Sequence, residues 1–257
     1  MIVAGNWKMN LSINEAIELS NGLLKHNEIF FEEKIIIFPS FLIIPDIYRL
    51  YKNSKISIGA QDCSMYDNGA FTGQVSAEMI KDAGCKYVII GHSERRSLCH
   101  ETSSIVSLKA VKAVSAGLKV IICIGENSKD REKGDYLFVL ENQLKQSLSD
   151  ISSDSNLLSK NIIIAYEPVW AIGTGNTASK KDIEEVQLAF RPAKGELRKR
   201  RVVVYDSSMK HYIGQRGIVL RKDGEGVTQV QYKDSTCLLY TSPSPRDLST
   251  SRMPSSA

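Results

Sequence analysis

Six short runs of apolar, largely β-branched residues recur along the first 166 residues, and they limit the fold more than any other feature. The runs are MIVAG at residue 1, KIIIF at 34, ISIGA at 56, YVIIG at 87, LKVIICIG at 118 and NIIIAY at 161. They lack the alternation of polar and apolar residues that marks a half-buried strand. This pattern is typical of parallel strands that are buried on both faces.

Amphipathic helical patterns lie between most of these runs. The patterned segments are residues 13–26, 102–117, 136–150 and 180–190. A strand followed by a helix, repeated six times, predicts an α/β fold with a parallel sheet. An open doubly wound sheet and a closed barrel both agree with this order.

Polar and ionisable residues follow directly after several of the predicted strands. They are Asn6 and Lys8 after the first run, His92 and Glu94 after the fourth, Glu126 after the fifth and Glu167 after the sixth. The carboxyl ends of parallel strands are where both kinds of α/β fold place their chemistry. Side chains from strands so far apart in sequence meet most easily if the sheet closes. No GxGxxG motif follows the first strand, which argues against a dinucleotide-binding fold.

Composition excludes several classes of protein. The five cysteines form no CxxC pair and show no metal-binding spacing, which favours a reduced, cytoplasmic chain. The first residues lack the basic start and apolar stretch of a signal peptide. No apolar run approaches the roughly 18 residues that a membrane span needs. We therefore expect a cytoplasmic protein without a membrane segment.

Glu167 and Lys8 each have a chemical and a structural interpretation. Glu167 lies between an apolar strand and the residues PVW, where partial desolvation would make its carboxylate a stronger base. The alternative is a glutamate that caps or pairs at a strand end. Lys8 lies at the mouth of the first strand, where its charge attracts an anion and stabilises an oxyanion. The alternative is a solvated surface lysine.

His92 and the loop after Glu167 are the other candidate functional features. A histidine at a helix N-terminus has its cationic form disfavoured, so His92 would act as a neutral electrophile; a hydrogen-bonded core histidine is the alternative. The loop PVWAIGTGNTAS has the composition of a lid, in which Gly173 and Gly175 permit unusual backbone angles. Amides around Gly173 would bind phosphate oxygens. An ordinary strand-to-helix connection is the alternative.

Taken together, these segments resemble the triosephosphate isomerase family. The motifs AGNWKMN, GHSERR, CIGE and AYEPVWAIGTG stand in that family's order and spacing, and GAQDCSMYDNGAFTGQVSAEMIKDAG is similar to its third strand and the long loop that follows. The resemblance covers residues 1 to about 190. It implies a (β/α)8 TIM barrel.

The resemblance also implies a reaction and a set of roles. The enzyme interconverts dihydroxyacetone phosphate and D-glyceraldehyde 3-phosphate, in glycolysis and gluconeogenesis, without cofactor or metal. The implied roles are proton transfer for Glu167, carbonyl polarisation for His92, enediolate stabilisation for Lys8, substrate binding for Asn6 and Gly173, and support from Glu94 and the buried Cys123. The family is dimeric, so the loop at residues 64–74 would reach a partner, with Thr72 near the partner subunit's Asn6.

The pattern changes after residue 190. Residues 1–190 hold 20 basic and 23 acidic side chains, whereas residues 191–257 hold 13 and 6. Neither a YGGSV-like phosphate loop nor the family's later double-glycine segment is present. We expect residues 191–235 to be a basic β-rich segment of foreign or out-of-frame origin, with strands RVVVY, GIVLR and VTQVQY and a KDGEG turn. We expect residues 236–257, rich in Ser, Pro and Arg, to be disordered.

Two consequences follow from this break. A barrel with only six recognisable βα units leaves open edges, so we predict impaired or absent activity. RVVVY and GIVLR are candidates for the missing strands, but no glycine-rich loop follows either. The alternative function is an inactive, truncated barrel fused to a small basic β module that binds nucleic acid or protein. We expect a triose phosphate as the partner, and no nucleic acid.

Overall fold

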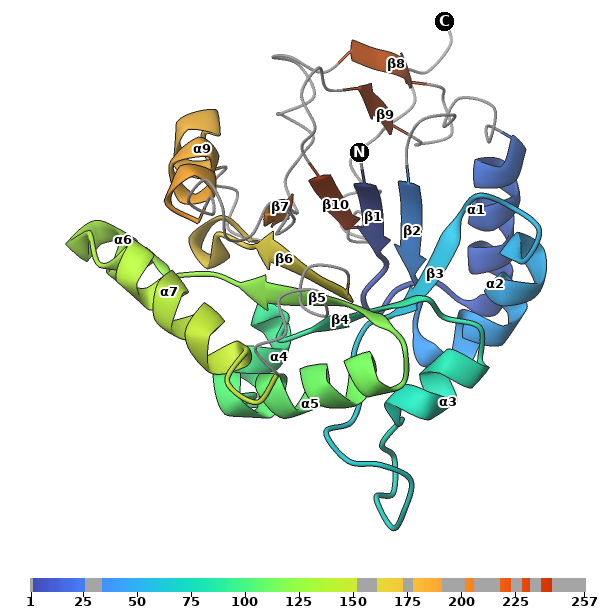
Figure 1. Cartoon of the computed structure of the whole chain (residues 1–257). Coiled ribbons are helices and arrows are strands. Elements are labelled where there is room, and N and C mark those ends of the chain that lie inside the picture. The colour runs from blue at the N-terminus through green and yellow to red at the C-terminus, as the bar shows by residue number, and fades with distance from the viewer. Residues whose placement is uncertain are drawn as a thin grey trace, which may run out of the picture.

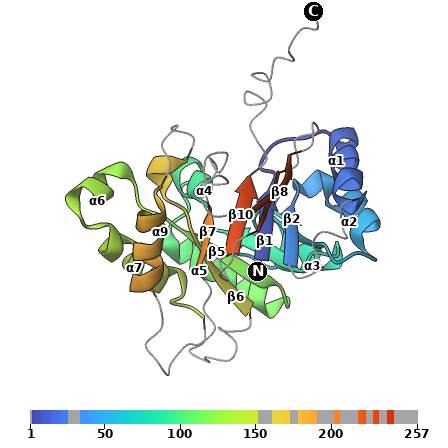
Figure 2. The same ribbon diagram turned by 90° about the horizontal axis from the view of Figure 1, so that it is seen from above.

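The computed structural model describes residues 2–25, 34–151, 161–172, 178–190, 202–205, 218–222, 228–231 and 237–241. Eight of its strands form a closed barrel in the order β1-β10-β7-β6-β5-β4-β3-β2 (Figures 1 and 2). Every neighbouring pair in the barrel is parallel. The strands are β1 (Ile2–Asn6), β2 (Lys34–Phe38), β3 (Ser57–Ala60), β4 (Tyr87–Ile90), β5 (Lys119–Ile124), β6 (Ile162–Tyr166), β7 (Val202–Tyr205) and β10 (Cys237–Thr241).

The six strands predicted from the apolar runs are confirmed, and β7 and β10 occupy the two remaining positions in the ring of strands. β7 is the predicted strand RVVVY and pairs with β6, while β10 pairs with both β7 and β1. β10 lies inside the segment for which we expect disorder. The physical reason for the pairing is that β1 and β6 each offer a row of backbone donors and acceptors, which the two short runs β7 and β10 satisfy.

The predicted strands GIVLR and VTQVQY pair with each other rather than joining the barrel. β8 (Ile218–Lys222) and β9 (Thr228–Gln231) form a two-stranded antiparallel sheet. Most of the predicted KDGEG turn between them lies outside the described residues. Figure 1 shows this sheet beyond the amino-terminal end of β1, at the opposite end of the barrel from the carboxyl ends of the strands.

Helices surround the barrel on its outer face (Figure 1). They are α1 (Ile13–Lys25), α2 (Ile44–Tyr51), α3 (Ala77–Asp82), α4 (Ser93–Leu98), α5 (Ser103–Ser115), α6 (Ser128–Lys133), α7 (Tyr136–Ser147) and α9 (Lys180–Ala189), with short 3-10 turns η2 (Phe41–Ile43) and η3 (Val169–Ala171). The four predicted helices are among them. Thr102 caps α5 by accepting a hydrogen bond from the amide of Ile105, as its sequence predicts. None of the helices described is long and apolar enough to span a bilayer.

The core has two layers, because successive strand residues face opposite sides of the barrel wall. The smaller layer fills the barrel interior and contains Ile2, Ala4, Ile36, Phe38, Tyr87, Ile89, Ile121, Cys123 and Ala165. The larger layer lies between the barrel and its helices. Gly59 on β3 shows how tightly the interior packs, since a Cβ there would lie 2.2 Å from Cε1 of Phe38. A filled interior directs binding to the ends of the strands.

Candidate active site

Four of the residues predicted from sequence gather at the carboxyl ends of the barrel strands. Asn6 is the last residue of β1, Lys8 follows it, His92 is the N-cap of α4 after β4, and Glu167 follows β6. Barrel closure brings these segments, far apart in sequence, around one mouth. The position of each residue at a strand end was the sequence signal that identified it.

Glu167 and His92 lie next to each other, buried from solvent. Glu167 is 1% exposed and His92 is 3% exposed. Oε1 of Glu167 lies 3.5 Å from Nε2 of His92, and Oε2 accepts a hydrogen bond of 3.1 Å from the amide of Ser93. Oε1 has no hydrogen-bond partner in the described part of the chain. A buried carboxylate oxygen without a donor is a good acceptor for a proton from a bound molecule.

The hydrogen bonds of His92 define its tautomer. Its Nδ1 accepts a hydrogen bond of 3.2 Å from the amide of Glu94, in the first turn of α4. A ring nitrogen that accepts a hydrogen bond carries no proton. In this arrangement the ring is neutral, and its proton resides on Nε2, facing Glu167 and the mouth of the barrel.

Lys8 is held in a strained backbone conformation. Its φ angle is 51°, in the left-handed region that non-glycine residues seldom adopt. The Lys8 amide donates to Oδ1 of Asn6 over 2.9 Å, and the Lys8 carbonyl accepts from Nε2 of Gln61 over 2.9 Å. Such strain persists only where surrounding contacts enforce it. Gln61 was missed from the sequence, because a glutamine after a strand carries no distinctive pattern.

Glu94 connects Lys8 to His92. Its Oε1 accepts from Nζ of Lys8 over 2.7 Å, and its Oε2 lies 3.4 Å from Nδ1 of His92. The carboxylate therefore neutralises the charge of Lys8. An incoming anionic ligand competes with Glu94 for the same ammonium group.

Cys123 lies behind the carboxylate of Glu167. It faces the barrel interior on β5. Burial, together with the negative charge of Glu167, raises the pKa of the Cys123 thiol well above its usual value. The thiol is therefore a poor nucleophile at neutral pH.

Glu126 has a structural role that its position in the sequence did not reveal. It is fully buried, and its Oε1 accepts hydrogen bonds from the hydroxyl of Tyr166 at 2.8 Å and from Nε1 of Trp170 at 2.9 Å. Nη1 of Arg131 lies 3.6 Å from the same oxygen. Burial raises the pKa of the Glu126 carboxyl. The glutamate thus ties the end of β5 to the turn that follows Glu167.

Two predicted residues lie elsewhere. Gly173 lies outside the described residues, which stop at Ile172 and resume at Ala178. Thr72 is exposed in the long loop between β3 and α3. In the same loop the rings of Tyr66 and Phe71 stack with centroids 4.2 Å apart.

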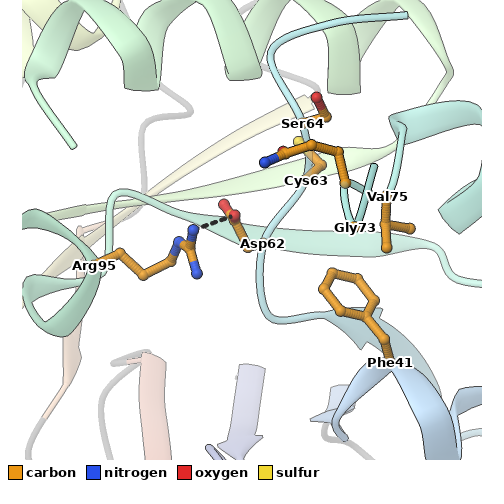
Figure 3. Close-up of a pocket in the computed structure, with 8 residues that line it drawn as sticks. Phe41, Asp62, Cys63, Ser64, Gly73, Val75 and Arg95 are labelled. Atoms are coloured by element: carbon orange, nitrogen blue, oxygen red, sulfur yellow. Dashed lines mark ion pairs between the residues drawn. The ribbon is translucent and has the colours of Figure 1, made fainter. Parts of the chain in front are cut away.

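A pocket of about 120 Å³ opens at the base of this loop. Figure 3 shows Arg95 and Asp62 pointing toward each other across it, with an ion pair of 2.9 Å. Its lining consists of Phe41, Asp62, Cys63, Ser64, Gly73, Gln74, Val75 and Arg95. Glu167 and His92 are not in this lining, so the pocket is separate from the catalytic candidates. The described residues contain no cluster of three or more His, Cys, Asp or Glu side chains suited to a metal.

Comparisons with known proteins agree on one family. A family model described as triosephosphate isomerase matches residues 1–213. The triosephosphate isomerase of Prosthecochloris aestuarii is 44% identical over 191 residues, covering 74% of each chain. That of Geotalea uraniireducens is 38% identical over 230 residues, covering 88% of this chain and 90% of the relative. The crystal structure of triosephosphate isomerase from Bartonella henselae superposes with a TM-score of 0.68 at 34% identity, covering 80% and 82%.

The resemblance was expected to cover residues 1 to about 190. The family model matches residues 1–213, a range that includes β7.

Proposed function

The chain belongs to the triosephosphate isomerase family, and from this premise we propose a mechanism by which it interconverts dihydroxyacetone phosphate and D-glyceraldehyde 3-phosphate. The two sugars differ by the positions of two hydrogens: one moves between adjacent carbons, and the other moves between the oxygens on those carbons. The reaction therefore requires a base that removes a proton from one carbon and returns it to the other, and an acid that serves the two oxygens. The intermediate is an enediolate.

Glu167 is the base in this mechanism. Its Oε1 has no hydrogen-bond donor among the described residues, while Oε2 is fixed by the amide of Ser93. One oxygen thus anchors the carboxylate and leaves the other to take the proton.

His92 is the electrophile. With Nδ1 engaged by the amide of Glu94, the proton on Nε2 is directed at the substrate oxygens. A neutral imidazole polarises the carbonyl and then exchanges protons between the two oxygens of the enediolate, so no charged acid is needed. The 3.5 Å between Nε2 and Oε1 of Glu167 allows one substrate to contact both groups.

Lys8 provides the positive charge. The phosphate and the enediolate are both anionic, and the ammonium group at the mouth of β1 attracts the first and stabilises the second. Asn6 holds the backbone of Lys8 and lies at the end of the same strand. Glu94 keeps the ammonium group in place until the substrate displaces it.

The phosphate site is the weakest part of this chain. We propose that the amide of Gly173 binds phosphate and that the loop after Glu167 closes over the substrate, because an enediolate phosphate exposed to water eliminates its phosphate. The residues after β7 begin DSSMK and those after β10 begin SPSPR, so neither segment supplies the glycine pair that lets backbone amides approach a phosphate. We expect slower turnover than in relatives that keep both glycine segments.

We also propose that the chain works in the cytoplasm as a homodimer. Met9, next to Lys8, is 97% exposed although it is apolar. The loop at residues 64–74 carries the stacked Tyr66 and Phe71, and the pocket of Figure 3 lies at its base. An exposed apolar side chain and a pocket on one molecule suit a two-fold interface. Sedimentation equilibrium tests this, and a monomer at micromolar concentration would contradict it.

The single observation that carries the function is the buried pair of Glu167 and neutral His92. The test is a coupled assay of the 257-residue chain on D-glyceraldehyde 3-phosphate, with Glu167→Gln as control. Glu167→Gln keeps the shape of the side chain but removes the base, so we expect loss of measurable turnover. Turnover that survives in Glu167→Gln would refute the assignment. No turnover in either protein would favour the alternative, an inactive barrel joined to a basic β module.

A further inference from the structure

We propose that Gln143 on α7 is a positioning residue for Glu167, acting through the backbone of Gly125. The inference rests on the proposed role of Glu167 as the base. Gln143 lies on an outer helix and does not contact Glu167 itself. Its effect on the base depends on the short segment 124–126 at the end of β5.

The carboxamide of Gln143 pairs with Gly125 as a neighbouring peptide group would. The amide of Gly125 donates to Oε1 of Gln143 over 3.0 Å, and Nε2 of Gln143 donates to the carbonyl of Gly125 over 2.8 Å. Both backbone groups of one residue are thus satisfied by a single side chain. Two matched hydrogen bonds fix orientation as well as distance.

The backbone of Gly125 needs a side chain as its partner, because the neighbouring strand β4 ends before it reaches Gly125. The pairing of β4 with β5 runs only to Ile90 opposite Ile122. Gly125 lies three residues farther along, and no described strand pairs with it on that side. An unpaired buried backbone donor or acceptor costs free energy, so the glutamine replaces the missing strand.

On its other side, segment 124–126 accepts hydrogen bonds from residues 167–169, the segment that carries Glu167. The amide of Glu167 donates to the carbonyl of Ile124 over 2.7 Å, and the amide of Val169 donates to the carbonyl of Glu126 over 3.0 Å. Between these two bonds, Gly125 packs directly under the backbone of Glu167. A Cβ on Gly125 would lie 1.9 Å from the Glu167 carbonyl oxygen.

The three layers therefore form one connected unit: helix α7, segment 124–126 and segment 167–169. Helix α7 is a firm support because Leu140 and Leu144 bury its inner face. Removing the carboxamide leaves the two backbone groups of Gly125 without partners. Segment 124–126 then shifts until water forms hydrogen bonds with these groups. Glu167 then moves with it, since its amide and carbonyl both contact this segment.

The test compares Gln143→Leu with Gln146→Leu. Gln146 lies one turn later on the same helix and is exposed, so its substitution matches the change in composition without touching Gly125. We expect Gln143→Leu to lower kcat by about 10- to 100-fold with KM nearly unchanged, because misplacing a base affects the proton transfer and not phosphate binding. Gln146→Leu keeps the kcat of the unsubstituted chain.

A second readout does not depend on turnover. Amide hydrogen exchange is measured at Gly125 and Glu167 in the folded proteins. We expect both amides to exchange faster in Gln143→Leu while amides in the centre of β5 stay protected. Gln146→Leu leaves all of these amides unchanged.

The outcomes separate this inference from the proposed function. A folded Gln143→Leu with the kcat and amide protection of the unsubstituted chain overturns the positioning role. An equal loss of kcat in Gln146→Leu overturns it too. If the unsubstituted chain shows no turnover, the proposed function fails and the exchange measurement alone decides on Gln143. If Gln143→Leu does not fold, Gln143→Asn replaces it, because its carboxamide is one methylene too short to reach Gly125.

Discussion

The indole nitrogen of Trp170 donates a hydrogen bond of 2.9 Å to Oε1 of Glu126, and this bond joins the turn after Glu167 to the end of β5. The tyrosine hydroxyl at position 166 donates to the same oxygen. Glu126 is therefore a fully buried carboxylate with two neutral hydrogen-bond donors and an arginine 3.6 Å away. Its charge is costly to bury, and the cost depends on pH.

Replacement of Glu126 by glutamine should make stability less dependent on pH. Because burial raises the pKa of Glu126 above its usual 4.5 in the folded state, the protonated carboxyl favours folding. That contribution is fully present below the unfolded pKa and is lost as pH rises through the folded pKa. We expect the difference in Tm between Glu126→Gln and the unsubstituted chain to increase from pH 4 to pH 8. Each kcal/mol of unfolding free energy should shift Tm by roughly 2–4 °C.

The exposed Glu141 provides the matched control for this prediction, since it forms a surface ion pair with Lys145 on α7. Thermal unfolding of Glu141→Gln should follow the unsubstituted chain across the same pH range. A Tm difference for Glu126→Gln that stays constant with pH would contradict the assigned cause.

Alanine at Gly125 should damage both stability and catalysis. A Cβ at this position would lie 1.9 Å from the Glu167 carbonyl oxygen, so the two segments must separate. Overpacking of this kind costs about 1–3 kcal/mol of unfolding free energy. We expect Gly125→Ala to unfold at lower urea concentration and to lose turnover.

Gly22 in α1 is the comparison for that substitution, because nothing lies within 4 Å of a Cβ there. Alanine in a helix interior stabilises it by about 0.5–1 kcal/mol relative to glycine. The two substitutions should therefore move the urea midpoint in opposite directions. A destabilised Gly22→Ala would show that glycine removal alone, rather than the contact with Glu167, explains the loss.

Removal of the charge at Lys8 should weaken turnover without unfolding the chain. We expect Lys8→Met to lower kcat by about 10²–10³-fold, the loss typical of a group that stabilises an oxyanion. KM should rise as well, because the ammonium group also attracts the phosphate. The exposed Lys52 offers a control, and Lys52→Met with the same loss would indicate a general effect of net charge.

The cysteines should differ sharply in their reactivity toward a thiol reagent. Burial raises the pKa of Cys63 and of Cys85 to about 12, and the pKa of Cys123 is also raised, whereas Cys99 is exposed. Only a thiolate attacks such a reagent. At pH 8 we expect the peptide that contains Cys99 to be labelled first among these four. Early labelling of Cys123 in the folded chain would contradict its placement behind Glu167.

Much of the site is predictable from sequence. A residue that directly follows a buried strand lies at the mouth of the barrel, however the surrounding helices are packed. Glu167 and His92 were identified on this basis, and the structure brings them together. Barrel closure by β10 was not predicted. The five residues Cys237–Thr241 lie in a Ser- and Pro-rich stretch, and their pairing depends on the open edge of β1, which sequence patterns do not record. Gln143 was missed because its importance depends on where β4 ends.

The pairing of β10 with β1 has a consequence for how the chain is made. Val3 lies opposite Leu238, so β1 is synthesised long before the strand that covers one of its edges. During synthesis β1 and β7 therefore both present an unpaired backbone edge until β10 is made. Contacts between such distant parts of a chain form slowly, and an uncovered strand edge is a template for association with other chains. The yield of folded protein will thus depend on chaperones and on the rate of translation as well as on the stability of the finished barrel.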